Sequence, residues 1–167
     1  MVAFEEIRLP SGELVEIEKL EAQFAPWRGD EVDTYGGKQV IDYRGRPAFA
    51  ELVVLWGMQE DGWQGVWIDT YRRKLRTGYW NVAPIQNLPE RPSSLLDRIY
   101  AIAGSRAGAW DVFCWRGDEI RFTDCKRRSR DRIQPSQLHF LMSAGSVSIT
   151  PSCFRIVEWD VGAPPAA

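Results

Sequence analysis

The segment 110–126 constrains the fold of this chain most, because its pattern predicts a β-hairpin with a defined register. Its two halves are rich in β-branched and aromatic residues, and they flank a turn signal centred on Gly117-Asp118. A two-residue loop of this kind suits a primed turn, in which glycine supplies the unusual backbone angles. We therefore predict two antiparallel strands in which Phe113 faces Phe122.

Charged residues occupy the open end of this hairpin, away from its turn. The same register places Asp111 opposite Asp124, and Lys126 shares their face because successive side chains of a strand alternate between faces. Two carboxylates about 5 Å apart repel one another and raise one pKa unless a cation lies between them. Mg²⁺ binds through one or two carboxylates together with waters and phosphate oxygens. The pattern therefore predicts a metal site, with Lys126 placed to stabilise charge on a phosphate or to help deprotonate an attacking water.

The alternative is a hairpin that simply ends in exposed charged side chains, because D-x-K triplets are common. The residues that follow favour a functional site. A basic run over 127–132 comes directly after Lys126. Residues 134–145 then predict a helix with proline near its start and glycine at its end, and residues 153–159 predict a strand.

This order of hairpin, basic loop, helix opening on Gln-Pro-Ser-Gln, and strand resembles the VRR-NUC branch of the PD-(D/E)xK nuclease superfamily. In that family an acidic residue on one strand precedes (E/D)-x-K on the next. The resemblance covers residues 108–160. It implies that Asp111 and Asp124 are metal ligands, that Lys126 is the catalytic lysine and that Gln137 is the glutamine of the downstream helix.

The resemblance also has implications for the fold and the chemistry. It implies an α/β restriction-endonuclease-like core, a small mixed β-sheet flanked by helices in the order α-β-β-β-α-β, with an N-terminal β-hairpin added. The implied activity is that of a Mg²⁺- or Mn²⁺-dependent phosphodiesterase, an endonuclease that hydrolyses nucleic acid, with DNA as the expected substrate. The backbone carbonyl of Cys125 is a further candidate metal ligand. Two residues depart from the family pattern: Trp110 stands where proline is usual, and Asp124 stands where glutamate is usual.

Members of this superfamily usually have a helix ahead of the hairpin that contributes a glutamate, and residues 46–57 predict such a helix. Proline lies in its first turn, and apolar residues recur at helical spacing from Phe49 to Trp56. A lone carboxylate on an apolar helix is costly to bury unless it is paired or metal-bound. Glu51 is therefore a candidate for a third acidic group at the site. The alternative is that Glu51 lies on the exposed side of the helix, beside Leu55.

Two basic runs are candidates for contacts with nucleic acid. The first follows a strand predicted over 62–71 and lies among aromatic residues, and the second follows Lys126. Cations mixed with aromatic rings are typical of surfaces that hold phosphates and stack bases, although most such runs are only solvated loops. The expected nucleic-acid-binding residues are Arg72, Arg73, Lys74, Arg127, Arg128, Arg130 and Arg132.

Charge is distributed unevenly along the chain. Residues 1–61 carry thirteen acidic and six basic side chains, whereas residues 62–167 carry ten and fifteen. The acidic part begins with two alternating segments around Pro10-Ser11-Gly12, which predict a hairpin. This acidic arm could mask a basic surface, dock on a partner or keep the protein soluble.

Three regions are expected along the chain. They are an acidic N-terminal arm and loop over 1–45, a nuclease-like core over 46–160 and a flexible tail over 161–167. Within the core, a helix predicted over 95–103, after a proline-rich loop, is an insertion that Gly104 ends.

The remaining features limit other functions. No apolar run approaches the length of a membrane span and no signal peptide is recognisable, so we expect a cytoplasmic protein with no membrane partner. The three cysteines predict buried thiols, and the single histidine, His139, offers no catalytic triad. A homodimer is left open. Two non-enzymatic alternatives are a catalytically inactive nuclease-like module that binds nucleic acid, and a subunit that binds a protein partner.

Overall fold

The computed structural model describes residues 2–34 and 36–162. Its strands are β1 (Ala3–Arg8), β2 (Leu14–Pro26), β3 (Ile41–Tyr43), β4 (Arg46–Ala48), β5 (Gln64–Asp69), β6 (Lys74–Arg76), β7 (Val112–Arg116), β8 (Glu119–Arg127) and β9 (Phe154–Val161). Its helices are α1 (Ala50–Glu60), α2 (Glu90–Ala103) and α3 (Pro135–Gly145), with a short 3-10 helix over Pro151–Cys153.

The β7–β8 hairpin forms with the predicted register. Phe113 pairs with Phe122, and Trp115 pairs with Ile120. The strands are joined by the predicted two-residue turn, in which Gly117 has a φ of 57°, a backbone angle that glycine adopts without strain. The hairpin is therefore the part of the fold that follows most directly from local sequence.

One mixed sheet joins the nine strands of the described residues in the order β4-β3-β2-β9-β8-β7-β5-β6, with β1 paired to β2 outside this path. β9 runs parallel to both of its neighbours, β8 and β2. β5, β7 and β8 are successively antiparallel. The hairpin thus lies in the middle of the sheet, where both of its faces can be covered.

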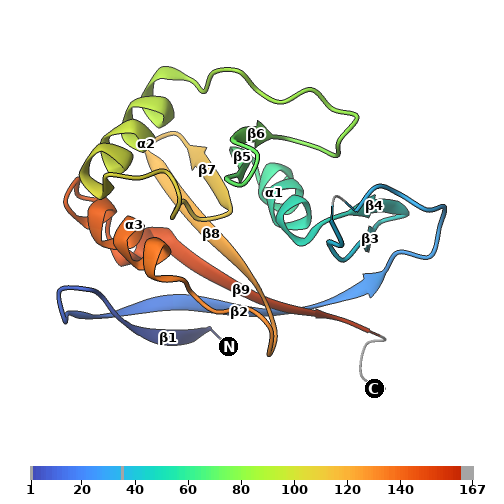
Figure 1. The fold of residues 1–167 in the computed structure, drawn as a ribbon, viewed down its shortest axis with the longest axis horizontal. Coiled ribbons are helices and arrows are strands. Elements are labelled where there is room, and N and C mark those ends of the chain that lie inside the picture. Colours follow the sequence, from blue (N-terminus) through green and yellow to red (C-terminus); the bar gives the residue numbers. More distant parts are fainter. Residues whose placement is uncertain (1, 35, 163–167) are drawn as a thin grey trace.

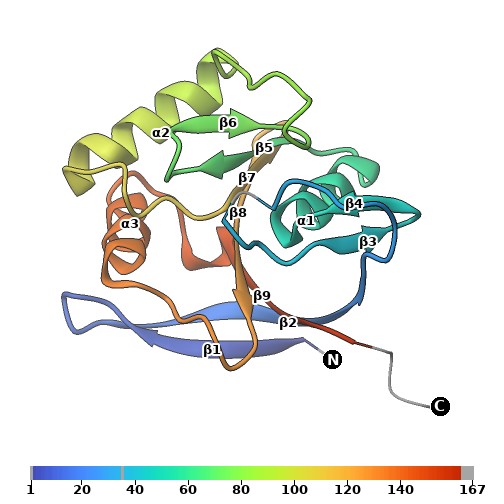
Figure 2. The same cartoon turned by 45° about the vertical axis from the view of Figure 1, so that its right-hand side comes forward.

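Helices cover both faces of the sheet at the hairpin (Figures 1 and 2). Since successive residues of a strand point to opposite faces, Val112 packs into the cluster formed with α1, whereas Phe113 packs into the cluster formed with α2 and α3. A mixed sheet with helices on both faces confirms the predicted α/β class.

Phenylalanine rings fill the core beneath α3. The rings of Phe113 and Phe122 are stacked with centroids 4.5 Å apart, and Phe122 is stacked on Phe154 of β9 at 5.1 Å. Phe140 of α3 meets the ring of Phe122 edge-on at 5.2 Å. All four rings are essentially inaccessible to solvent. Their packing fixes α3 over the hairpin and so determines where the first turn of α3 lies.

The N-terminal hairpin forms as predicted, and its second strand continues into the main sheet. β2 pairs with β1 along one edge and with β9 along the other, from Glu18 to Phe24. Ile17 of β2 is completely buried in the same core as Phe122. The acidic segment expected as an added arm therefore contributes a long strand to the sheet, next to β9 (Figure 1).

The helix predicted over 46–57 begins later, at Ala50, and continues to Glu60. Residues 46–48 instead form β4, which pairs with β3 through a turn at Arg44-Gly45, where both residues have positive φ. A primed turn of this type usually contains asparagine or glycine at its first position, so its arginine gave no signal. The suggestion that Leu55 lies on an exposed side of this helix is also wrong, because Leu55 is completely buried.

The inserted helix begins earlier than predicted, at Glu90, and Gly104 ends it in a left-handed conformation with a φ of 70°. Pro92 lies in its first turn, where backbone N–H groups have no partner within the helix, so the N–H that proline lacks costs no hydrogen bond. Of the tail expected over 161–167, residues 163–167 lie outside the described residues. No helix of the described ranges is long and apolar enough to cross a membrane.

Candidate functional site

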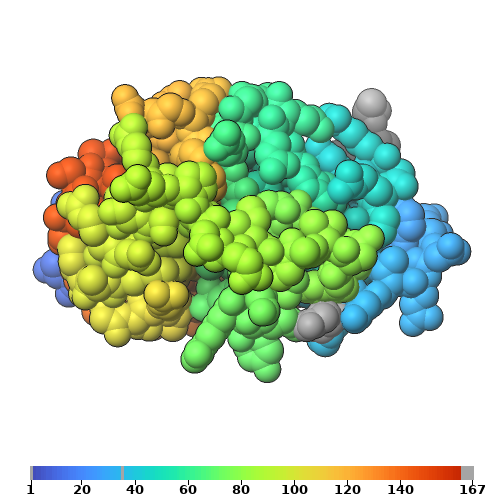
Figure 3. Space-filling view, turned by 90° about the horizontal axis from the view of Figure 1, so that it is seen from above, coloured from blue at the N-terminus to red at the C-terminus, as the bar shows by residue number. Residues whose placement is uncertain are grey.

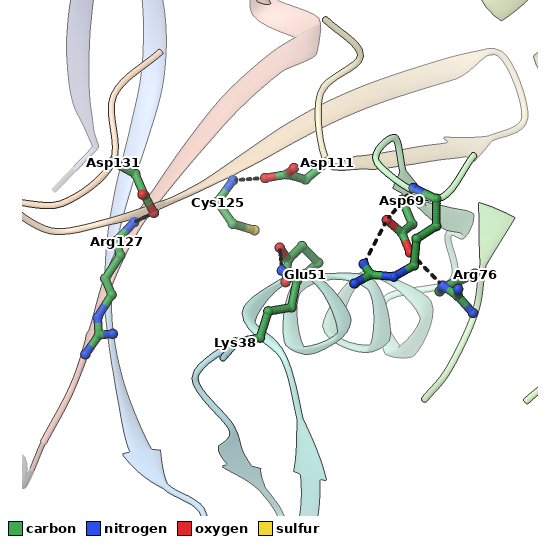
Figure 4. Close-up of polar contacts among 9 residues, drawn as sticks. Lys38, Glu51, Asp69, Arg76, Asp111, Cys125, Arg127 and Asp131 are labelled. Atoms are coloured by element: carbon green, nitrogen blue, oxygen red, sulfur yellow. Dashed lines mark hydrogen bonds and ion pairs between the residues drawn. The ribbon is translucent and has the colours of Figure 1, made fainter. Parts of the chain in front are cut away.

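Asp111 lies directly before β7, at the open end of the hairpin. Its backbone carbonyl accepts a hydrogen bond of 2.7 Å from the N–H of Ile68 in β5. Its carboxylate Oδ2 accepts a hydrogen bond of 2.8 Å from the backbone N–H of Cys125 in β8 (Figure 4). Asp111 is therefore held between the two strands that flank it, with its carboxyl group at the position where β7 and β8 separate.

Asp124, Lys126 and Gln137 form a closed network on the α3 side of the sheet. Gln137 Nε2 donates to Asp124 Oδ1 at 2.8 Å, and its Oε1 accepts from Lys126 Nζ at 3.0 Å. The Lys126 ammonium also forms an ion pair of 2.8 Å with Asp124 Oδ2. Asp124 is completely buried, so these contacts compensate for the loss of water around its charge. Gln137 thus orients the acid and the amine of the D-x-K motif together.

The first turn of α3 fixes the Gln137 side chain. Its Oε1 also accepts a hydrogen bond of 2.9 Å from the backbone N–H of Gln134, which forms the capping box of the helix. The Gln137 carbonyl accepts a hydrogen bond from the indole N–H of Trp110. Trp110 therefore ties the segment before β7, which carries Asp111, to the helix that carries Gln137.

The carboxyl groups of Asp111 and Asp124 are neighbours at the open end of the hairpin and interact directly. Burial, followed by the negative charges of Asp124 and Glu51, raises the pKa of Asp111 well above its usual range, and the hydrogen bond from Cys125 only partly opposes this. When Asp111 is ionised, no donor of the described residues other than the Lys126 ammonium reaches Asp124 Oδ2. Two acids in this arrangement favour either a shared proton or a cation between them.

Glu51 and Lys38 lie on the other side of the sheet, next to Cys125. Lys38 Nζ donates to Glu51 Oε1 at 2.6 Å, and the Glu51 side chain is only 13% exposed. Burial alone would lower the pKa of Lys38, but the charge and hydrogen bond of Glu51 outweigh it, so this pKa is raised. Glu51 is therefore half-buried and paired, and does not lie on an exposed side of α1.

The Cys125 thiol points toward Glu51 in Figure 4. Burial, followed by the charges of Asp111, Glu51 and Asp124, raises the pKa of this thiol well above its usual range. Since the thiolate is the nucleophilic form, this environment disfavours the reactive form of Cys125. The three cysteines are free; Cys114 and Cys125 are buried, as predicted, whereas Cys153 is only partly buried.

The described residues contain no group of three or more His, Cys, Asp and Glu side chains close enough to hold a metal ion together. Asp111 and Asp124 are a pair, and Glu51 is engaged by Lys38. A pair of carboxylates fits Mg²⁺ or Mn²⁺, which are commonly held by one or two carboxylates with the remaining positions filled by water and phosphate. The same pair does not fit a structural zinc site, which uses four nitrogen or sulfur ligands.

The basic residues after Lys126 have two different environments. Arg127 lies 3.6 Å from Asp160 and stacks over Trp159, and Arg128 pairs with Glu158 at 3.5 Å. Arg130 and Arg132 are exposed and form no ion pair with the described residues. Only the second pair of arginines is therefore available for a phosphate without breaking an existing ion pair.

The first basic run divides in the same way. Asp69, which is 5% exposed, forms ion pairs with Arg76 at 2.9 Å and with Arg72 at 3.6 Å (Figure 4). Arg73 and Lys74 are exposed and have no ion pair within 2–34 and 36–162. Arg72 is therefore a structural residue of the β5–β6 hairpin, whereas Arg73 and Lys74 project from it.

Comparison of the chain with protein-family models, with curated proteins and with solved structures yields no match.

Proposed function

We propose that this protein is a Mg²⁺- or Mn²⁺-dependent nuclease that hydrolyses phosphodiester bonds, with DNA as the substrate to test first. The observation that carries the proposal is the pair of neighbouring carboxyl groups, Asp111 and Asp124, at the mouth of the hairpin, with the Lys126 ammonium 2.8 Å from Asp124. A buried acid pair with an adjacent amine is energetically unfavourable as a purely structural feature. The combination of two carboxyl groups and an ammonium group is suited to binding a divalent cation and a phosphate.

The order of the elements supports the same proposal. α1, β5, β7, β8, α3 and β9 follow one another as α-β-β-β-α-β, with β6 and α2 as insertions. In the sheet, β5, β7, β8 and β9 are neighbours, and only the β8–β9 pair is parallel. We infer from this order that the core is restriction-endonuclease-like. Two contacts near the open end of the hairpin support the proposal: Glu51 of α1 adds to the negative charge around Asp111, and Gln137 of α3 contacts both Asp124 and Lys126.

Asp111 and Asp124 would hold the metal ion, with the Cys125 carbonyl as a further ligand and Glu51 available only after release from Lys38. When bound, the ion would neutralise phosphate charge and lower the pKa of a water molecule. Lys126 would then place its positive charge beside the phosphate oxygens, where charge develops during hydrolysis. Gln137 would keep Lys126 and Asp124 oriented, and Arg130 and Arg132 would contact the phosphate backbone.

The decisive test is cleavage of single-stranded, duplex and branched DNA with Mg²⁺ and with Mn²⁺. Asp124→Asn should abolish cleavage, and Lys126→Ala should lower its rate by at least about 10²-fold, the loss expected for removal of one charge-stabilising group. Asp118→Asn is the matched control, because Asp118 is an 88% exposed acid at the other end of the hairpin. Retained cleavage in Asp124→Asn, with normal circular dichroism, would show that the assigned residues do not carry the reaction.

A non-catalytic module that binds nucleic acid is the second candidate. The observation that favours it is the closure of the Asp124 network, since both carboxylate oxygens are already engaged by Gln137 and Lys126. The same assay separates the two functions. Binding of DNA at low salt without cleavage in either metal would support the module and exclude the nuclease.

A further inference from the structure

We propose that the cavity between the β5–β6 hairpin and α2 binds one unpaired nucleotide of the substrate. This inference rests on the proposed nuclease function and narrows its substrate to nucleic acids with a single-stranded end, flap or extruded base. The cavity measures about 860 Å³, within the range of ~300–1,000 Å³ that is usual for small-molecule sites.

Three parts of the chain enclose the cavity. They are the end of the β5–β6 hairpin, the segment joining β6 to α2, and α2 with the loop after it. The joining segment, lime green in Figure 3, lies across the face of the molecule next to yellow-green α2. The walls include Tyr71, Arg73, Lys74, Asn87, Tyr100 and Arg106.

One residue that lines the cavity, Ile68, is hydrogen-bonded to Asp111 of the candidate active site. β5 and β7 are antiparallel with Trp67 paired to Val112, so the next pair is Ile68 with Asp111, and the hydrogen bond from Ile68 N–H to the Asp111 carbonyl joins them. Ile68 lines the cavity. In an antiparallel pair, opposite residues share a face, so the cavity and Asp111 lie on the same face of the sheet.

Positive charge at the rim suits a phosphate. Asp69, which lines the cavity, is already paired with Arg72 and Arg76 outside the lining. The basic residues of the lining itself, Arg73, Lys74 and Arg106, form no ion pair with the described residues. Asp97 is the other acid of the lining. Cations that are free of internal ion pairs can bind phosphate without first breaking a contact.

The interior suits a planar base. Its floor contains Ile68, Leu75, Ile85 and Leu96, which are partly or fully buried. The ring of Tyr71 stands at the rim and is 89% exposed, and a base can stack on such a ring without distinguishing among sequences. Burial raises the pKa of Tyr100 to about 12, so its hydroxyl remains a neutral group on the wall.

The shape selects an unpaired base over a duplex. Bases inside a duplex are stacked on their neighbours and cannot enter a concave cavity unless they are extruded. A single-stranded end or flap supplies such a base at little energetic cost. With the base in the cavity and its phosphate at Arg73 and Lys74, the neighbouring phosphodiester would lie toward Asp111.

The test is binding of labelled DNA by the full chain in EDTA, where metal-dependent hydrolysis cannot interfere. Blunt duplex is compared with the same duplex carrying a short single-stranded extension. Tyr71→Ala should weaken binding of the extended duplex about tenfold through lost stacking, and Tyr71→Trp should retain it. The double variant Arg73→Ala, Lys74→Ala should reduce the slope of the logarithm of the binding constant against the logarithm of the salt concentration by about 0.7 for each cation removed. Neither change should alter binding of blunt duplex.

Arg91→Ala is the matched control, because Arg91 is 78% exposed and pairs with Asp118 at the turn end of the hairpin. If Tyr71→Ala weakens binding of both DNAs equally, or of neither, the cavity inference is wrong. The proposed nuclease function still stands in that case, provided that the parent protein cleaves DNA. Selective binding without cleavage in Mg²⁺ or Mn²⁺ supports the cavity and overturns the nuclease. No binding of any DNA at low salt overturns both.

Discussion

At the scale of the residue, burial and the charge of Asp124 both oppose the ionisation of Asp111 and so raise its pKa. The charge of Glu51 raises this pKa further. Between the ordinary carboxyl pKa and the raised pKa of Asp111, the folded chain therefore retains a proton that the unfolded chain releases. By linkage, the stability that this proton confers is fully present below the ordinary carboxyl pKa and is lost as the pH rises through the raised folded-state pKa.

Asp111→Asn should therefore stabilise the apo protein as the pH rises above about 4, the ordinary value for an aspartate. Asparagine does not titrate, and its side-chain oxygen can still accept the hydrogen bond from Cys125. The stability of the parent chain should fall with pH through the raised pKa of Asp111, whereas that of the variant should not show this fall. Thermal unfolding across a pH series, in EDTA, measures the difference.

Mn²⁺ should reverse the order of stability at neutral pH. A cation between the two carboxylates stabilises only the form that binds it, by RT ln(1 + [L]/Kd), so the parent chain should gain melting temperature and Asp111→Asn should gain little. Asp118→Asn serves as the control for loss of one exposed acid. An equal Mn²⁺ effect on the parent chain and on Asp111→Asn contradicts the assigned site.

At the scale of the element, the position of α3 depends on a close approach to the chain ahead of β7. A Cβ added to Gly108 would lie 1.9 Å from the carbonyl oxygen of Ser136 in the first turn of α3. Only glycine allows this approach, and the contact lies next to Gln137, which orients Asp124 and Lys126. Gly108 therefore acts on the site by positioning Gln137.

Gly108→Ala should destabilise the protein by about 1–3 kcal/mol, the usual range for a core substitution that forces backbone shifts, and should lower cleavage by displacing Gln137. Gly145→Ala is the control within the same helix, because nothing lies within 4 Å of its added Cβ. That change should be neutral or stabilising, since alanine favours helix over glycine by about 1 kcal/mol. Urea unfolding and the cleavage rate test both effects, and unchanged values for Gly108→Ala would contradict the proposed role.

The elements differ in how far local sequence determined them. The β7–β8 register was predictable because side-chain alternation and the turn at Gly117-Asp118 both specify it. The helix containing Gln137 was predictable from its proline and glycine. The start of α1 was not, because an unusual turn at Arg44-Gly45 creates β4. Within the site, Asp111, Asp124, Lys126 and Gln137 are brought together as expected.

Lys38 was missed because a single lysine in a glycine-containing loop carries no local signal, and its ion pair with Glu51 depends on tertiary folding. The same limit applies to the parallel pairing of β2 with β9. This pairing joins segments from the two ends of the chain, and the sequence pattern of neither segment indicates which strand it will pair with. Non-local contacts of this kind decide that β2 lies beside β9 within the sheet, whereas local patterns decide the β7–β8 pair.

At the scale of the whole molecule, the acidic N-terminal hairpin and the hairpin carrying Asp111 and Asp124 share one sheet. β9 lies between β2 and β8, and Ile17 of β2 belongs to the same buried cluster as Phe122. Loss of packing at Ile17 should therefore lower the stability of the whole folded chain. An N-terminal arm that folded independently would need a hydrophobic core of its own. Ile17 instead belongs to the same buried cluster as Phe122, so we expect the arm to fold with the rest of the sheet.

Ile17→Ala should lower the free energy of unfolding by about 2–5 kcal/mol, as large-to-small substitutions do in packed cores, and unfolding should remain a single transition. Leu14→Ala is the control on the same strand, because Leu14 is 47% exposed and should contribute little. Tryptophan fluorescence and far-ultraviolet circular dichroism should report the same shifted midpoint in urea, since the central and N-terminal strands unfold together. If Ile17→Ala instead produces a separate early transition and leaves the main midpoint unchanged, the N-terminal strands form an independent unit and the end of the sheet that carries Asp111 and Asp124 is stable without them.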